Sequence, residues 1–199
     1  MATVLKFDPL PEKSPAPQTA AERRIRFTSR GLAMLFVILF ATFALIMVAG
    51  FAAMLFYKGQ YLRIGPEGCY IGGGPTDSIA FGALPLQHRL IYVAVGVVRY
   101  APVLMLFWHL RGLFRLYARG ETFSRDAGAT FSRIGGWLGV YAVSPLVCHV
   151  ALSATGYEVD KAWLHMASVQ AFILGLLVFV IGQVMQVGRE IQEDREGFI

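Results

Sequence analysis

The stretch GLAMLFVILFATFALIMVAGFAAMLFY, residues 31–57, has no charged side chain along its whole length. A helix rises about 1.5 Å per residue, so about 20 apolar residues cross the hydrocarbon layer of a bilayer, roughly 30 Å thick. The run is longer than the apolar region of a cleaved signal peptide, about 7–15 residues, and no small-residue cleavage pattern follows it. The sequence therefore predicts a permanent membrane-spanning helix.

Three further apolar stretches follow, over residues 90–110, 134–153 and 163–187, and each is long enough to span a bilayer. Hydrophobic residues make up 56% of the 199 residues and charged residues 16%, whereas soluble proteins have about 45–50% and about 25%. Backbone groups in a bilayer must bond internally, and the runs show no strand-like alternation, which favours helices over a barrel. We predict an all-α membrane protein with four transmembrane helices.

The arginines are distributed unevenly between the two sides of the membrane. With four spans, both termini lie on the same side as the loop over residues 111–133. Eleven cations adjoin the membrane on that side: Arg23, Arg24, Arg26, Arg30, Arg111, Arg115, Arg119, Arg125, Arg133, Arg189 and Arg195. Four adjoin it on the other side: Lys58, Arg63, Arg89 and Lys161. The positive-inside rule predicts a bacterial inner-membrane protein with this loop and both termini in the cytoplasm.

The segments outside the spans receive separate predictions. Residues 1–30 combine four prolines with arginines and predict a disordered basic cytoplasmic tail. Residues 58–89 form an outer loop punctuated by glycine and proline, with candidate strands at 61–64 and 69–71 that predict a small hairpin over the helix mouths. The short connection over residues 154–162 is also expected outside. Residues 188–199 predict a polar cytoplasmic helix.

The cytoplasmic loop contains three arginines at a spacing of four residues: Arg111, Arg115 and Arg119. This spacing predicts an amphipathic extension of the second helix, ended by Gly120, with Ser124 and Asp126 capping the next helix. We call residues 111–133 the helical hairpin. Its arginines predict recruitment of anionic lipids or an acidic partner, at about 1 kcal/mol per cation, unless they serve only to set topology.

Two motifs in this loop resemble those of a known family. RGLFRLYARGETFS at residues 111–124, RIGGW at 133–137 and the acidic end EDREGFI at 193–199 resemble the bacterial inner-membrane family called domain of unknown function 2975. The resemblance covers residues 31–199. It implies a four-helix membrane protein, encoded in some relatives beside a small helix-turn-helix regulator. It implies no activity and supplies no catalytic residues.

Arg99 is a charged residue inside the second span, about nine residues or roughly 13 Å below its outer edge. Such a position costs about 2.5–3.5 kcal/mol on insertion scales, and no Asp or Glu lies in any span to pair with it. Candidate partners at similar depth are Tyr141, Ser144 and Gln170, together with carbonyls freed by Pro102 and Pro145. The group predicts either an anion-binding site of the kind found in transporters or a purely structural arrangement.

Histidine, cysteine and glycine positions leave further alternatives open. His88, His149 and His165 are predicted near the outer side with Cys148, where they could hold a metal or haem. Their spacing matches no ligand motif, so neither a metal nor a cofactor is predicted.

Cys148 and Cys69 are expected to be free thiols, although a disulfide is permitted. A GxxxG motif, Gly135 and Gly139, predicts close helix packing, within the chain rather than between copies.

No nucleophile with a positioned base, paired carboxylates or phosphate loop is recognisable, so the sequence does not predict an enzyme. Nucleic-acid binding is not predicted either, because the basic residues adjoin spans. The first hypothesis is a non-enzymatic, partner-binding, sensory or regulatory inner-membrane protein that contacts anionic lipids, a protein partner or a second copy. The alternatives are a small transporter or ligand-binding bundle around Arg99, and a haem- or metal-binding redox protein.

Overall fold

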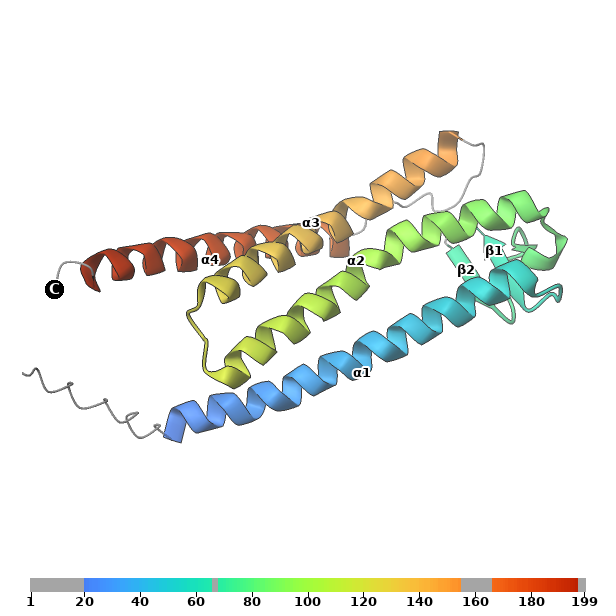
Figure 1. The fold of residues 1–199 in the computed structure, drawn as a ribbon. Coiled ribbons are helices and arrows are strands. Elements are labelled where there is room, and N and C mark those ends of the chain that lie inside the picture. Colours follow the sequence, from blue (N-terminus) through green and yellow to red (C-terminus); the bar gives the residue numbers. More distant parts are fainter. Residues whose placement is uncertain (1–19, 66–67, 155–165, 197–199) are drawn as a thin grey trace, which may run out of the picture.

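Four long helices dominate the computed structural model, which describes residues 20–65, 68–154 and 166–196 (Figure 1). In chain order they are α1 (Ala20–Phe56), α2 (Leu86–Arg119), α3 (Arg125–Ala154) and α4 (Met166–Glu196). Each is long and apolar enough to cross a membrane. The prediction of a mostly helical protein with four apolar spans is therefore confirmed.

The helices extend beyond the hydrocarbon layer. They contain 30 to 37 residues, which at the helical rise corresponds to about 45–55 Å against roughly 30 Å of hydrocarbon. Because α1 begins at Ala20, the prediction of disorder is wrong for residues 20–30. This segment contains no proline, and extending an existing helix is easier than nucleating one. The predictions for residues 1–19, 155–165 and 197–199 lie outside the described residues.

The helices pack in chain order, α1 on α2, α2 on α3 and α3 on α4. Within the described part of the chain, α4 forms no comparable interface with α1 or α2. The two outer helices of the row, α1 and α4, therefore lie on opposite sides of the central pair (Figure 1). The arrangement is a row of helices, so a ligand-binding bundle around Arg99 would not be closed by all four helices.

Aromatic rings form the contact between α1 and α2. Phe36 and Phe43 lie two turns apart on one face of α1, as expected from the helical repeat. The Phe36 ring stacks on Phe114 with centroids 5.6 Å apart, and Phe43 meets Phe107 edge to face at 5.9 Å. Aromatic pairs at these separations add about 0.5–1.5 kcal/mol to the burial of their surface.

Glycines allow α3 and α4 to approach closely. A Cβ atom added to Gly135 would lie 2.6 Å from both the Gly175 carbonyl oxygen and the Phe179 backbone nitrogen. At Gly182 it would lie 2.7 Å from the backbone nitrogen of Ser132. Gly135 of the GxxxG motif therefore packs against the chain's own α4, as predicted, whereas a Cβ atom at Gly139 would have nothing within 4 Å.

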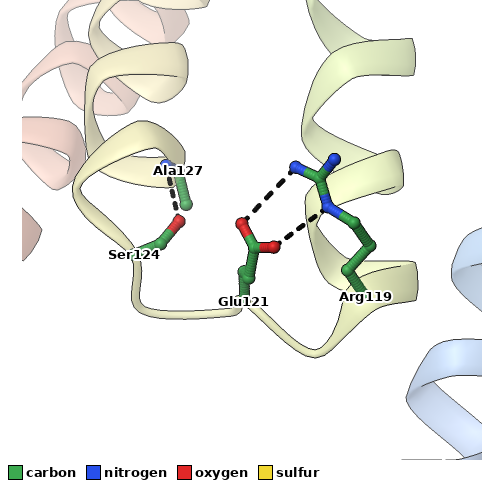
Figure 2. Close-up of polar contacts among 4 residues, drawn as sticks. All are labelled: Arg119, Glu121, Ser124 and Ala127. Carbon is green, nitrogen blue, oxygen red and sulfur yellow. Dashed lines mark hydrogen bonds and ion pairs between the residues drawn. The ribbon is translucent and has the colours of Figure 1, made fainter.

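The turn between α2 and α3 ends and begins its helices at the predicted residues. Gly120 is left-handed, with φ 88° and ψ 9°, and its N–H bonds back to the last turn of α2. Ser124 Oγ accepts a hydrogen bond from the Ala127 N–H at 3.1 Å (Figure 2). Four buried apolar residues fill the junction above this turn: Leu113, Leu116, Ala127 and Ile134.

A small antiparallel sheet lies between α1 and α2 in the chain. Its strands are β1 (Leu62–Gly65), β2 (Gly68–Ile71) and β3 (Ile79–Ala80), in the spatial order β2-β1-β3. The pair β1–β2, called the β-hairpin below, starts within one residue of each candidate strand, and β3 was not predicted. The strands lie at the end of the molecule where α1 ends and α2 begins (Figure 1). We call this the sheet end of the molecule.

Buried Arg89 ties the sheet end together. Its guanidinium donates hydrogen bonds to three backbone carbonyl oxygens, at 3.0 Å to Leu84, 2.9 Å to Gly82 and 3.1 Å to Leu55. Leu55 lies in the last turn of α1, where carbonyls have no partner within the helix. One side chain of α2 therefore satisfies the end of α1 and the segment that returns from the sheet.

Candidate functional site

A pocket of about 350 Å³ lies among α1, α2, α3 and the β-hairpin. This volume is at the small end of ligand pockets, which span roughly 300–1,000 Å³. No residue of α4 contributes to its wall. The lining residues are Phe51, Met54, Ile64, Gly68, Cys69, Tyr92, Val95, Gly96, Arg99, Tyr100, Pro145, Cys148, His149 and Leu152.

One face of α2 forms the floor of this pocket. Tyr92, Gly96 and Arg99 follow the spacing of three to four residues that places side chains on the same side of a helix. A Cβ atom at Gly96 would lie 2.7 Å from the ring of Phe51, so the glycine lets α1 close the pocket from one side. The same spacing, applied to Arg99 in the sequence, could have identified this face.

The guanidinium of Arg99 lies half-buried in the pocket wall. Among the residues that the structure describes, it forms no hydrogen bond or ion pair. Among the described residues of the wall there is no carboxylate and no second arginine or lysine. This part of the wall therefore carries one positive charge without a counter-charge, which favours any anion that can enter.

The structure does not bring the predicted partners of Arg99 together. Tyr141, Ser144 and Gln170 are absent from the pocket wall, and Gln170 is exposed on α4. Ser144 Oγ donates instead to the Tyr141 carbonyl at 2.9 Å, which is the carbonyl left free by Pro145. Equal depth in the membrane was a poor guide, because residues on different helices also need to face the same side.

The wall formed by α3 carries Cys148 and His149. Cys148 Sγ donates a weak hydrogen bond to the Val95 carbonyl at 3.6 Å, which links α3 to α2. His88 is not in the wall, and His165 lies outside the described residues. Within the described ranges, no group of three or more metal-ligating side chains is assembled.

The β-hairpin contributes Cys69, which sequence analysis placed at the helix mouths. Cys69 and Cys148 line the same pocket, and both are free thiols. Cys69 is exposed, and desolvation by the surrounding protein raises the pKa of its thiol. Because the thiolate is the reactive form, its alkylation should be slower than that of an unperturbed thiol near neutral pH. Cys69 is thus a natural reporter of this wall.

The three arginines of the helical hairpin have different surroundings. Arg119 forms an ion pair with Glu121, with Nε to Oε1 at 3.0 Å (Figure 2). Arg111 lies over the ring of Trp108, with its Cζ 4.9 Å from the ring centroid. Arg115 is exposed and, in the described part of the chain, has neither a hydrogen bond nor an ion pair. The three cations are therefore not equivalent.

Arg26 of α1 joins the same end of the molecule. A Cβ atom at Gly120 would lie 2.5 Å from a terminal guanidinium nitrogen of Arg26, so this side chain covers the turn that ends α2. A cation near the carbonyls at a helix C-terminus is electrostatically favourable. The contact could not be predicted from the sequence while residues 20–30 were expected to be disordered.

The fold and the pocket define a multi-pass α-helical membrane protein with a partly enclosed cavity near one end of its helices. A family described as protein of unknown function (DUF2975) matches residues 79–199, more than half of the chain, and the chain belongs to this family. No curated protein and no solved structure matches it. The match confirms the predicted family over a shorter range than residues 31–199. The matched range includes Arg99. Both α1 and the β-hairpin lie before it in the chain.

Proposed function

We propose that this chain is a non-enzymatic sensory or regulatory membrane protein that binds a small anion in the pocket around Arg99. The observation that carries the proposal is the unpaired guanidinium in the wall of a pocket of ligand size. A charge kept away from water without a partner is costly, and a bound anion offsets that cost. Intramembrane cations are functional candidates for the same reason.

Two features support a sensory role over simple storage of a ligand. Both α2 and α3 line the pocket and continue to the helical hairpin, and Arg119 is about 30 Å along α2 from Arg99. A ligand that shifts α2 against α3 would therefore move the hairpin. Under the orientation predicted by the positive-inside rule, the pocket faces the outer half of the membrane and the hairpin faces the cytoplasm.

Benzoate and its neutral analogue benzamide test the pocket, with Cys69 as reporter in a Cys148→Ala protein. We expect benzoate to slow alkylation of Cys69 by N-ethylmaleimide, because Cys69 and Arg99 line the same pocket and bound benzoate would block access to the thiol. Arg99→Gln should weaken this protection by about 10- to 100-fold in benzoate concentration, and Arg99→Lys should retain part of it. Arg115→Gln, at the other end of α2, serves as control. An anion site would be contradicted if benzamide protected Cys69 as well as benzoate does, or if benzoate protected Cys69 equally well in Arg99→Gln.

A second candidate function is attachment of the helical hairpin to anionic lipid headgroups. It is favoured by Arg115, which is exposed and has no partner among the described residues. Arg119 is already paired with Glu121, and Arg111 covers Trp108. Attachment would place a regulated surface at the cytoplasmic leaflet, in the predicted orientation.

The pair Arg115→Gln and Arg119→Gln separates lipid attachment from a general loss of charge. Each variant removes one positive charge, but only the first removes an unpaired one. We expect Arg115→Gln to lower the retention of phosphatidylglycerol by about fivefold, equivalent to about 1 kcal/mol. Arg119→Gln should have a smaller effect. Native mass spectrometry of detergent-purified protein measures the bound lipid, and equal losses in the two variants would argue against a role for Arg115.

A further inference from the structure

The side chains of the pocket wall indicate more about the ligand than that it is negatively charged. We propose that the pocket binds a short single-chain amphiphile with one negative charge, its head on Arg99 and its chain against the apolar walls. This inference rests on the proposed function, because it assumes that an anion occupies the pocket. Three observations support it, concerning charge, shape and access.

The charge of the wall balances one negative charge. Among the lining residues that the structure describes, Arg99 is the single arginine or lysine, and none is an aspartate or glutamate. A dianion would keep one of its charges without a partner in this partly enclosed site, which is unfavourable. The planar guanidinium can donate two parallel hydrogen bonds to a carboxylate or sulfonate. A monoanionic head therefore fits the site best.

The rest of the wall suits a hydrocarbon chain. Four apolar side chains belong to the lining: Phe51 and Met54 of α1, Leu152 of α3 and Ile64 of β1. Burial of each methylene group of a ligand against such surfaces is favourable. The volume of about 350 Å³ is small for a two-chain phospholipid and is adequate for one short chain.

The row of helices offers this ligand a route from the bilayer. Within the described chain, α1 and α3 form no extensive interface with each other, and α4 does not contribute to the pocket wall. The groove over α2 is therefore not sealed by a fourth helix, as it would be in a closed bundle. An amphiphile in the outer leaflet can enter through this open side, and its head reaches Arg99 by descending roughly 13 Å from the outer edge of the span.

Four ten-carbon or related probes test the ligand class on full-length Cys148→Ala protein in phosphatidylcholine nanodiscs. They are decane-1-sulfonate, decan-1-ol, decyltrimethylammonium and decyl phosphate, and a fifth compound, hexane-1,6-disulfonate, is a dianion that is charged at both ends and has no free hydrocarbon tail. Measurement at pH 8.5 keeps decyl phosphate mainly dianionic, because a phosphate monoester has a second pKa near 6. The rate of Cys69 alkylation is compared with and without each probe, and retained probe is counted by native mass spectrometry.

We expect decane-1-sulfonate to slow alkylation about tenfold at ten times its dissociation constant, and one molecule to be retained per chain. Decanol and decyltrimethylammonium should protect at least tenfold less well at equal concentration, and decyl phosphate should bind more weakly than the sulfonate. Arg99→Gln should remove the preference for the sulfonate over decanol. Gly96→Leu retains the charge but brings a Cβ atom within 2.7 Å of the Phe51 ring, so it should disturb the wall formed by α1 and reduce binding of every probe.

The outcomes distinguish this inference from the proposed function. If benzoate or the disulfonate protects Cys69 through Arg99 and decane-1-sulfonate does not, the pocket binds anions but the amphiphile is wrong. If decyl phosphate binds more tightly than decane-1-sulfonate, the single-charge argument is overturned. If no anion protects Cys69 through Arg99, both proposals fail. Arg99→Lys replaces Arg99→Gln if the glutamine variant does not fold, and it should lower sulfonate affinity while retaining selectivity over decanol.

Discussion

Replacement of Gly135 by valine forces α3 away from α4 and lowers the midpoint of thermal unfolding by about 2–12 °C. The new Cβ atom would lie 2.6 Å from the Gly175 carbonyl oxygen and from the Phe179 backbone nitrogen. Backbone atoms cannot rotate out of the way as side chains can, so the whole helix must move. Overpacking of this kind costs about 1–3 kcal/mol or more, and each kcal/mol corresponds to about 2–4 °C in a chain of this size.

Gly136→Val is the matched control, because a Cβ atom at Gly136 has nothing within 4 Å. Both variants add the same apolar bulk to neighbouring positions of one helix. Gly182→Val should behave like Gly135→Val, since its Cβ atom would meet the Ser132 backbone nitrogen at 2.7 Å. Size-exclusion chromatography of heated, detergent-solubilised protein measures the midpoint. Equal shifts for Gly135→Val and Gly136→Val would disprove close packing through Gly135.

Arg89→Met releases the sheet end from α1, with an expected loss of about 3–5 kcal/mol. The substitution retains an apolar stem but removes the donors that bond the Leu55, Gly82 and Leu84 carbonyls. Each buried carbonyl left without a donor costs about 1–3 kcal/mol, and partial hydration limits the total. Because the β-hairpin carries Cys69, protection of this thiol by benzoate should also be lost.

Limited proteolysis of the loop over residues 58–85 measures this release. Cleavage should become at least about tenfold faster in Arg89→Met, as local opening becomes easier. Lys58→Met removes an exposed cation from the same loop and should cleave like the unmodified protein. Arg89→Lys should be intermediate, because an ammonium group cannot reach three carbonyls with the geometry of the guanidinium fork. Unchanged cleavage of Arg89→Met would show that Arg89 does not hold the sheet end.

Local signals in the sequence were sufficient for the parts of the fold that depend on near neighbours. The charge-free run over residues 31–57 required a span because backbone groups in hydrocarbon must bond to one another. Gly120 and Ser124 could be assigned to helix ends because the left-handed turn and the cap are local features. Arg99 could be singled out because a charge within a span is costly wherever its neighbours lie.

The surroundings of Arg99 depended on contacts that periodicity does not encode. Depth along the membrane suggested Tyr141, Ser144 and Gln170, but the order of packing turned α2 toward α1, α3 and the β-hairpin instead. Likewise, the local pattern did not reveal that Arg89 closes the end of α1. Hydrophobic composition therefore determines which segments enter the membrane, because each side chain makes its own contribution to the free energy of insertion. Which faces meet is decided by shape, through glycine contacts and aromatic packing between segments far apart in the chain, and the pocket exists because of those meetings.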